Sequence, residues 1–313
     1  MPTSEQQPGF GYEGIASFCR APVCFDLTEL EAEIAVVGIC LDSGTSYRSG
    51  TRFGPKAIRE ASMLYSMGYT QQAGFYDIEL GKRLLAGVRM VDCGDIPTLP
   101  TLFVETLDLI TQFIRDIRAR GAIPVVLGGD HSISFPIVRA FENASLHVIQ
   151  FDTHLDLMDE VVGIRYSHAN PMKRISELDH VSGLTQIGIR GVLNQPEWVE
   201  TPISGTSAFF TAEDVRNKGA EYVASRIPEC ENIYVSLDID SLDPSVAPGT
   251  GTPEPGGLSY VDLRTLLRAC ARKGKLAGMD VVEVNPLFDP TGRTAQVAAR
   301  LIIDLLGAAD IQI

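Results

Sequence analysis

The chain has 313 residues, of which 45% are hydrophobic and 21% are charged, and this composition is typical of a folded globular protein rather than a disordered one. Its 40 acidic residues against 26 Lys and Arg give a net charge of -14, and no basic stripe is present, which argues against a nucleic-acid partner. The start, MPTSEQQPGF, does not resemble a signal peptide, and no stretch is long enough to span a membrane. We therefore expect a cytoplasmic protein that does not bind membranes.

Short runs rich in β-branched residues alternate with helix-like segments along the chain. The runs predict buried parallel strands at 34–39, 88–91, 123–127, 146–151, 184–189, 233–237 and 276–282. The segments between them predict helices at 102–120, 212–226, 259–272 and 294–306. Ser259 with Asp262 three residues later is typical of a helix start. The alternation predicts an α/β fold with a mostly parallel central sheet and helices on both faces.

The connections between these elements are uneven in length. No repeat, low-complexity tract or linker divides the chain, so we expect one domain over residues 1–313 with an irregular segment at about 1–33. Further irregular stretches at 40–56, 157–175 and 190–205 are long for connections, and such stretches are often functional loops.

The least ordinary residues follow predicted strands directly. Asp152, His154 and Asp156 come after the strand ending at 151, and their spacing places all three side chains on one side of an extended segment. In an open parallel sheet, ligands bind outside the carboxyl ends of the strands. Carboxylates at this density repel one another unless a cation, a base or a proton lies between them.

Two further strand ends carry the same residue types. Asp238 and Asp240 follow the strand ending at 237, and His131 closes a Gly-Gly-Asp-His turn after the strand ending at 127. A single Asp at a strand end is more often a helix cap, and a lone His is usually structural, as we expect for His147 and His180. Three such strand ends together make that interpretation improbable. Four carboxylates and two imidazoles, without thiolates, suit a pair of manganese ions, with nickel, cobalt or zinc as alternatives.

Several longer segments resemble the signature blocks of the ureohydrolases, the family of arginases, agmatinases and guanidino-acid hydrolases. The upstream block at 41–60 is similar to the agmatinase and guanidino-acid branch, and the similarity runs from about residue 10 nearly to the end. The resemblance implies a three-layer α/β/α arrangement of the arginase type. The blocks that carry it are GGDHS (128–132), DTHLD (152–156), SLDIDSLDPSVAPGTGTPEPGG (236–257), DVVEVNP (280–286) and LDSGTSYRSGTRFGPKAIRE (41–60).

The resemblance also implies a ligand set for two divalent ions, most often Mn²⁺, with Ni²⁺ as an alternative. Within it, Asp152 and Asp238 bridge both ions, His131 and Asp156 complete one site, and His154 and Asp240 complete the other. Members of the family usually form trimers or hexamers, so we expect a homotrimer or homohexamer.

The implied reaction is hydrolysis of a linear amidine C–N bond, with release of urea from a guanidino compound. A hydroxide shared by the two ions attacks the guanidinium carbon. Glu283 orients the guanidinium, Asp156 passes a proton to the leaving nitrogen, and His168 matches the position of a proton shuttle. The alternative for His168 is a local hydrogen bond within its loop. We expect Asp130 and Asp243 to accept hydrogen bonds from ligating groups.

The chain departs from the family pattern at three places. Thr153 stands where the family usually has Ala, and its added hydroxyl must find a partner. Its consequence is left open between a tilted ligand strand, a preference for nickel and local repacking. Met158 stands where arginases place an Asn for the substrate carboxylate, which argues against arginase activity, and Ala169-Asn170 replaces a frequent Gly-Thr.

The substrate is expected to be a small cationic or zwitterionic guanidino compound. Agmatine or a guanidino acid such as 4-guanidinobutyrate is preferred, and free guanidine or another small substituted guanidine, hydrolysed with nickel, is the alternative. Arg165 with Tyr166 is a candidate for binding a substrate carboxylate, and Trp198 with Asn194 for lining the pocket. The full set of expected substrate contacts is Glu283, His168, Asn170, Arg165 and Trp198.

Two functions outside this reaction also fit parts of the sequence. A single-zinc amide hydrolase of the deacetylase kind uses the same fold, but it needs neither His131 nor Asp240 as a ligand. A non-catalytic subunit of a hetero-oligomer is usually marked by degenerate ligands, whereas all six predicted ligands are present here.

Overall fold

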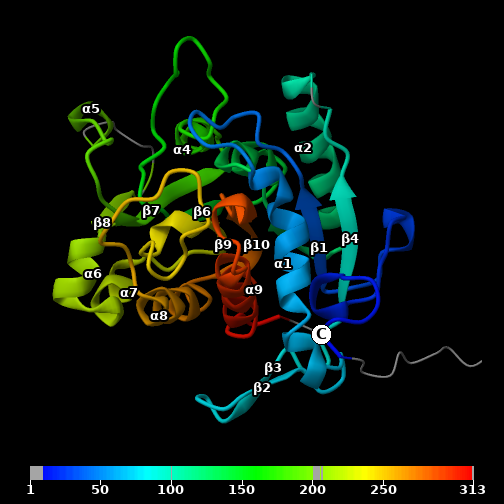
Figure 1. Ribbon diagram of the computed structural model, residues 1–313. Coiled ribbons are helices and arrows are strands. Elements are labelled where there is room, and N and C mark those ends of the chain that lie inside the picture. The colour runs from blue at the N-terminus through cyan, green and yellow to red at the C-terminus, as the bar shows by residue number, and fades with distance from the viewer. Residues whose placement is uncertain (1–9, 100, 200–204, 206, 312–313) are drawn as a thin grey trace, which may run out of the picture.

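The computed structural model describes residues 10–99, 101–199, 205 and 207–311. Eight strands form one sheet in the order β4-β1-β5-β10-β9-β6-β7-β8, and every neighbouring pair is parallel (Figure 1). The strands are β1 Ile34–Ile39, β4 Met90–Ile96, β5 Ile123–Leu127, β6 Leu146–Phe151, β7 Val181–Ile189, β8 Ala208–Thr211, β9 Asn232–Asp238 and β10 Lys275–Val282. A separate antiparallel hairpin joins β2 Phe75–Asp77 to β3 Lys82–Leu84.

The central strands are apolar without interruption because both faces of the sheet are covered. β1, with the sequence IAVVGI, is buried at every position, and it has the bounds that the sequence predicts, as do β5 and β6. β4 starts at Met90 rather than at residue 88 and continues to Ile96 along its ladder with β1, and the charge of Asp92 within it is paired with Arg59. β8, a four-residue strand at the sheet edge, was not predicted.

Helices cover both faces of the sheet. On one side α1 packs on α9, α8 packs on α9, and α7 packs on α8; on the other side α2 packs on α3 and α3 packs on α4. Each side has its own buried apolar cluster, so the three-layer α/β/α fold is confirmed. The helices are α1 Gly54–Ser62, α2 Phe103–Ala119, α3 Ser134–Arg139, α4 Pro171–Ser176, α5 Pro196–Val199, α6 Ala212–Lys218, α7 Ala220–Arg226, α8 Tyr260–Cys270 and α9 Arg293–Leu306.

Two helix predictions have different outcomes. The start at Ser259 is confirmed, because its side chain accepts a hydrogen bond from the Asp262 N–H at 3.1 Å. The single helix predicted over 212–226 is wrong: Gly219, with φ of 89°, separates α6 from α7. Among the described residues, no helix combines the length and the apolar character that crossing a membrane requires. The single-domain organisation stays a prediction.

The strand order determines where the functional residues meet. β5, β10, β9 and β6 are consecutive neighbours in the middle of the sheet. Residues 131, 283, 238–240 and 152–156 follow these four strands at their carboxyl ends. Since parallel strands end at the same edge, the fold brings all four segments together there.

Candidate metal centre

The turn that carries His131 packs tightly against the segment after β1. A Cβ at Gly129 would lie 1.7 Å from the Leu41 carbonyl oxygen, so only glycine fits at this position. The next residue, Asp130, donates its N–H to the same carbonyl at 2.8 Å. This close approach directs His131 into the edge of the sheet, where it is 1% exposed.

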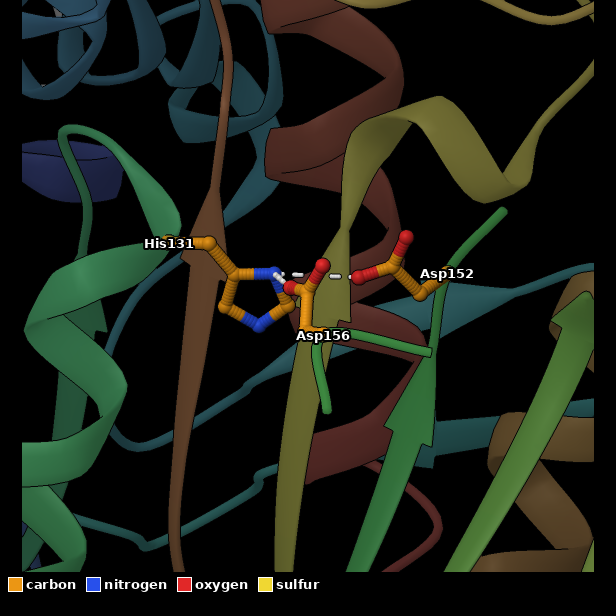
Figure 2. A group of neighbouring side chains, drawn as sticks. All are labelled: His131, Asp152 and Asp156. Atoms are coloured by element: carbon orange, nitrogen blue, oxygen red, sulfur yellow. Dashed lines mark ion pairs between the residues drawn. The ribbon is translucent and has the colours of Figure 1, made fainter. Parts of the chain in front are cut away.

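His131 faces three carboxylates. Its Nδ1 lies 3.0 Å from Oδ2 of Asp152, 2.9 Å from Oδ2 of Asp156 and 3.3 Å from Oδ2 of Asp238. Figure 2 shows Asp152 and Asp156 converging on the ring from the segment that follows β6. These atoms form one compact donor group.

A second group forms around His154. Its Nδ1 lies 3.5 Å from Oδ1 of Asp152 and 3.4 Å from Oδ2 of Asp240. Asp152 therefore turns one oxygen toward each histidine, as a bridging carboxylate would. Asp238 lies between the two groups, since its Oδ1 accepts the Asp240 N–H at 2.8 Å. All six predicted ligands thus meet at one place.

The carboxylates crowd one another. Burial, followed by the charges of Asp240 and Asp152, raises the pKa of Asp238 well above its usual range. Burial and the charge of Asp152 also raise the pKa of Asp156 to about 6. Burial alone would lower the pKa of His154, but the carboxylates of Asp240 and Asp152 raise it to about 12. The cluster has an excess of negative charge, which divalent cations can balance.

The orientation of His131 fits a metal ligand. Its Nε2 lies 2.9 Å from the Ser236 hydroxyl, which donates to Oδ1 of Asp280 at 2.7 Å. Nε2–H is therefore the donor, and the lone pair of Nδ1 points at the carboxylates, where this buried atom has no hydrogen-bond partner among the described residues. Such a hydrogen-bonded imidazole is typical of metal ligands. The residues fit a pair of divalent ions.

The residues behind the ligands were not predicted. Ser236 lies two positions before Asp238, and Gln150 lies two positions before Asp152, whose Oδ2 it holds with a 2.6 Å hydrogen bond from Nε2. The period of two in a strand places each on the same face as its ligand. A buried polar residue in an otherwise apolar strand was the signal that could have identified both.

The supporting roles predicted for Asp130 and Asp243 are wrong. Asp130 accepts hydrogen bonds from Ser132 and, at 2.7 Å, from the Gly44 N–H. Asp243 accepts from Ser245 and from the N–H groups of residues 256 and 257. Both carboxylates hold loops together, as Asp residues in turns commonly do.

Glu283 lies beside this donor set with one oxygen free. Its Oε1 accepts the His131 N–H at 2.9 Å and lies 3.2 Å from Nδ1 of His168. Its Oε2 is buried without a hydrogen-bond partner among the described residues. Glu283 and Asp156 have φ of 63° and 54°, in the left-handed region that non-glycine residues rarely adopt. Such strain is often found at functional sites.

His168 connects Glu283 to the loop after β1. Its Nε2 lies 3.1 Å from the Ser46 N and 2.7 Å from the Ser46 hydroxyl. Burial lowers the pKa of His168, but the hydrogen bond and charge of Glu283 outweigh it and raise the pKa to about 9. The Ser46 N–H opposes this shift, because it can donate only to a nitrogen that carries no proton.

Comparisons with known proteins agree with this geometry. A model of the arginase family matches residues 32–307. The chain belongs to the arginase family. It is 34% identical to guanidinobutyrase and 35% identical to guanidinopropionase, both of Pseudomonas aeruginosa, over 96% and 94% of this chain and 93% and 92% of theirs. The structure of proclavaminate amidino hydrolase from Streptomyces clavuligerus superimposes with a TM-score of 0.82 at 32% identity, covering 95% of this chain and 98% of that one.

Membership of the arginase family implies a dinuclear divalent metal site, and the two His/Asp groups stand where that site is expected. The role of each ligand stays a prediction. Thr153, the departure from the family pattern, is fully buried, and its hydroxyl has no hydrogen-bond partner among the described residues. Its N–H donates to Oδ1 of Asp240 at 3.2 Å, so the backbone of the ligand segment is held although the hydroxyl is not.

The three remaining predicted substrate contacts lie at the start of α4, in the loop before it and in α5. Asn170 is buried, and its amide holds its own loop through Ser167 and the Met158 carbonyl. The Arg165 side chain is 56% exposed and lies 3.6 Å from Asp159. Trp198, in α5, packs against the apolar cluster on the α2 side of the sheet. These contacts do not decide whether Asn170, Arg165 or Trp198 binds the substrate, and that role stays a prediction for all three.

Proposed function

We propose that this chain is a dinuclear-metal amidinohydrolase that hydrolyses a guanidino compound and releases urea. The observation that carries the proposal is the Glu283 carboxylate. It is buried and bonded to the N–H of His131, one of six converging His and Asp ligands, and its Oε2 has no partner among the described residues. A buried carboxylate with a free oxygen is suited to a cationic guanidinium, whose N–H groups pair well with carboxylates.

Glu283 is held for this role from two sides. The His131 N–H and the His168 ring fix Oε1, which leaves Oε2 to accept from the substrate. A Cβ at Gly251 would lie 3.8 Å from Oε2, so the glycine leaves space in front of the carboxylate. Because Oε1 of Glu283 accepts the N–H of the ligand His131, a guanidinium bound to Oε2 would lie beside the donor set, as hydrolysis requires.

Two residues can manage protons during the reaction. Asp156, whose carboxylate lies 2.9 Å from Nδ1 of His131, is placed to take a proton from the attacking water and pass it to the leaving nitrogen. His168, held between Ser46 and Glu283, can exchange protons between the site and the loop at residues 44–46. Two divalent ions held by the six ligands would activate water as the nucleophile.

The substrate we propose is a guanidino acid such as 4-guanidinobutyrate, or agmatine. The names of the two Pseudomonas relatives favour the acid. Free guanidine with nickel is the second candidate. The observation behind it is the buried Thr153 hydroxyl, which lies between two predicted ligands and has no hydrogen-bond partner among the described residues.

The test is a urea-release panel of agmatine, 4-guanidinobutyrate, 3-guanidinopropionate, arginine and guanidine, run with Mn²⁺ and with Ni²⁺ on wild type and Glu283→Gln. We expect turnover of a guanidino compound that falls about 10³-fold in Glu283→Gln, because the substrate guanidinium loses the carboxylate that orients it. Glu177→Gln, an exposed carboxylate near Arg165, is the matched control and keeps full activity. Two bound ions with no urea from any substrate would contradict the proposal.

We also propose manganese as the ion, a homotrimer or homohexamer as the assembly, and the cytoplasm as the location. Metal analysis of the purified protein tests the first, with two ions per subunit expected. One zinc ion per subunit with activity on acetyl-lysine would favour the deacetylase-like alternative. Light scattering tests the assembly.

A further inference from the structure

The side chain of Arg190 binds both ends of the loop that begins at Asp240. Arg190 lies directly after β7, and β7 packs against the 3-10 turn Ile239–Ser241. The Arg190 guanidinium donates at distances between 2.7 and 3.3 Å to six backbone carbonyls, those of Gly188, Asp240, Ser241, Leu242, Glu254 and Pro255.

Five of these six acceptors lie at the two ends of one loop, and the sixth, Gly188, lies in β7. The carbonyls of residues 240–242 belong to the ligand Asp240 and the two residues after it. The carbonyls of residues 254 and 255 lie at the other end of the loop, before α8. The approach is close, since a Cβ at Gly191 would lie 2.7 Å from the Glu254 side chain. All six acceptors are backbone oxygens, so the planar fork of Arg190 fixes the path of the main chain.

The backbone around Arg190 also holds the other ligand segment. The Arg190 N–H donates to the Thr153 carbonyl at 3.0 Å, and the Thr153 N–H donates to Oδ1 of Asp240 at 3.2 Å. Asn194 accepts the Leu155 N–H at 3.0 Å and donates to the Arg190 carbonyl at 2.9 Å. Residues 190–194 therefore clamp the segments of His154 and Asp240.

The other half of the donor set is held by different residues. His131 is oriented by Ser236 and Asp280, and its N–H is bonded to Glu283. The acceptors of Arg190 include none of these groups. The guanidinium contacts of Arg190 thus lie on the Asp240 side of the metal site, whereas Asp152 and Asp238 lie between the two halves.

We propose that Arg190 is a positioning residue for one ion of the pair, the ion held by His154 and Asp240, and that it acts through the path of the loop at 240–255. The proposal rests on the dinuclear site of the proposed function. It predicts that replacing Arg190 lowers the affinity for that one ion. Loss of a residue that supports a metal ligand commonly lowers metal affinity by about 10–100-fold.

The experiment compares Arg190→Lys and Arg190→Ala with wild type by titrating metal-free protein with Mn²⁺ and following the bound ion by calorimetry and electron paramagnetic resonance. Arg216→Lys is the matched control, because exposed Arg216 makes one contact with the same loop, to the Gly256 carbonyl at 3.0 Å. We expect one of two binding events to weaken about 10–100-fold in both Arg190 variants. The other event, and both events in Arg216→Lys, should change less than about twofold, in line with an exposed contact.

A second background tests which ion is affected. Asp240→Ala removes the side chain through which the clamp is proposed to act, so adding Arg190→Lys to it should weaken the remaining ion no further. Additional loss there, equal weakening of both ions, or no weakening in either Arg190 variant overturns the proposal. If Arg190→Ala does not fold, Arg190→Lys still decides. Wild type that fails to bind two ions contradicts the proposed function instead, so the two failures are distinguishable.

Discussion

The ligand edge (residues 131, 152–156 and 238–240) and the outer loops (157–170 and 190–199) border the same site, but they are built differently. At the ligand edge, backbone and side-chain hydrogen bonds hold almost every residue, and the carboxylates are buried. In the outer loops, Val162 and Val192 are 97% and 88% exposed. The difference indicates that rigid strand ends fix the chemistry, whereas exposed loops are free to set the substrate.

The clamp at residues 190–194 is where the two regions meet. It begins the second outer loop, and its side chains Arg190 and Asn194 hold ligand segments. A substitution in the clamp can therefore change metal binding. Only substitutions in the outer loops outside the clamp are expected to change substrate binding without changing metal binding.

The largest effect is expected at the ligand edge, from Asp240→Ala. The variant should lose one ion and about 10³-fold in turnover, since a metal ion contributes several kcal/mol to the transition state. The unfolding free energy of the metal-free variant should not fall, because one of the repelling carboxylates is gone. Metal analysis, urea release and denaturant unfolding measure these changes. Asp159→Asn, in the outer loop, is the control, and two tightly bound ions in Asp240→Ala would refute the ligand assignment.

The next largest effect is expected from replacing His168. This residue lies in an outer loop, but its ring contacts Glu283 at the metal site. His168→Asn should lower turnover about 10²-fold without changing the metal content, as expected for loss of a proton carrier. The pKa of His168, raised to about 9 by Glu283 against burial, also predicts a pH effect. The folded state keeps a proton that the unfolded chain releases near its ordinary pKa of 6.5.

This proton stabilises the fold fully below about pH 6.5, and its contribution is lost as the pH rises to about 9. Wild type should therefore lose stability relative to His168→Asn between these values. The unfolding free energy of metal-free protein at pH 6, 7.5 and 9 measures the difference. A constant difference would mean that the Ser46 N–H, bonded to Nε2, keeps the ring neutral.

A smaller effect is expected for Arg165→Ala in the outer loop. The Arg165 side chain is half-exposed and lies near Asp159 and Glu177, so a contact with a substrate carboxylate is worth at most about 1 kcal/mol. We expect the KM for 4-guanidinobutyrate to rise about threefold to fivefold, with an unchanged KM for agmatine, which has no carboxylate. Equal changes for both substrates would exclude Arg165 as a carboxylate contact.

The sequence is more informative about the ligand edge than about the outer loops. The sheet was predictable because buried parallel strands are continuous apolar runs, and the bounds of β1, β5 and β6 are those of the pattern. Five of the six ligands were predictable because their spacing follows the period of a strand, and His131 was predictable because it follows a third strand end directly after a Gly-Gly-Asp turn. β8 and the break at Gly219 were not, since a short edge strand and a single glycine leave weak patterns.

The supporting contacts were predictable only in part. Ser236 and Gln150 interrupt apolar strands and carried a signal. Arg190 carried none, because its acceptors are backbone carbonyls up to 65 residues away in the chain, and no pattern of side chains reports such contacts. The roles of Asp130 and Asp243 were misassigned for a related reason: each is near a ligand in sequence but bonded to a loop.

The smallest effect is expected from Thr153→Val, within the ligand edge itself. The Thr153 hydroxyl is buried without a partner among the described residues, and an unsatisfied buried group costs about 1–3 kcal/mol. Valine keeps the shape and removes the hydroxyl, so the unfolding free energy of the metal-free protein should rise by about 1 kcal/mol. Turnover and the number of bound ions should not change, because the backbone N–H that meets Asp240 remains.

Thr185→Val on the neighbouring strand is the matched comparison. Thr185 is equally buried, but its hydroxyl lies 2.8 Å from Nε2 of His147, so the same substitution should lower the unfolding free energy by about 1–2 kcal/mol. A rise in unfolding free energy for Thr153→Val with a fall for Thr185→Val would show that Thr153 affects only local packing. If Thr153→Val instead changes the ratio of Mn²⁺ to Ni²⁺ affinity, the hydroxyl acts on the ligand segment, and even the ligand edge would carry a determinant of metal choice.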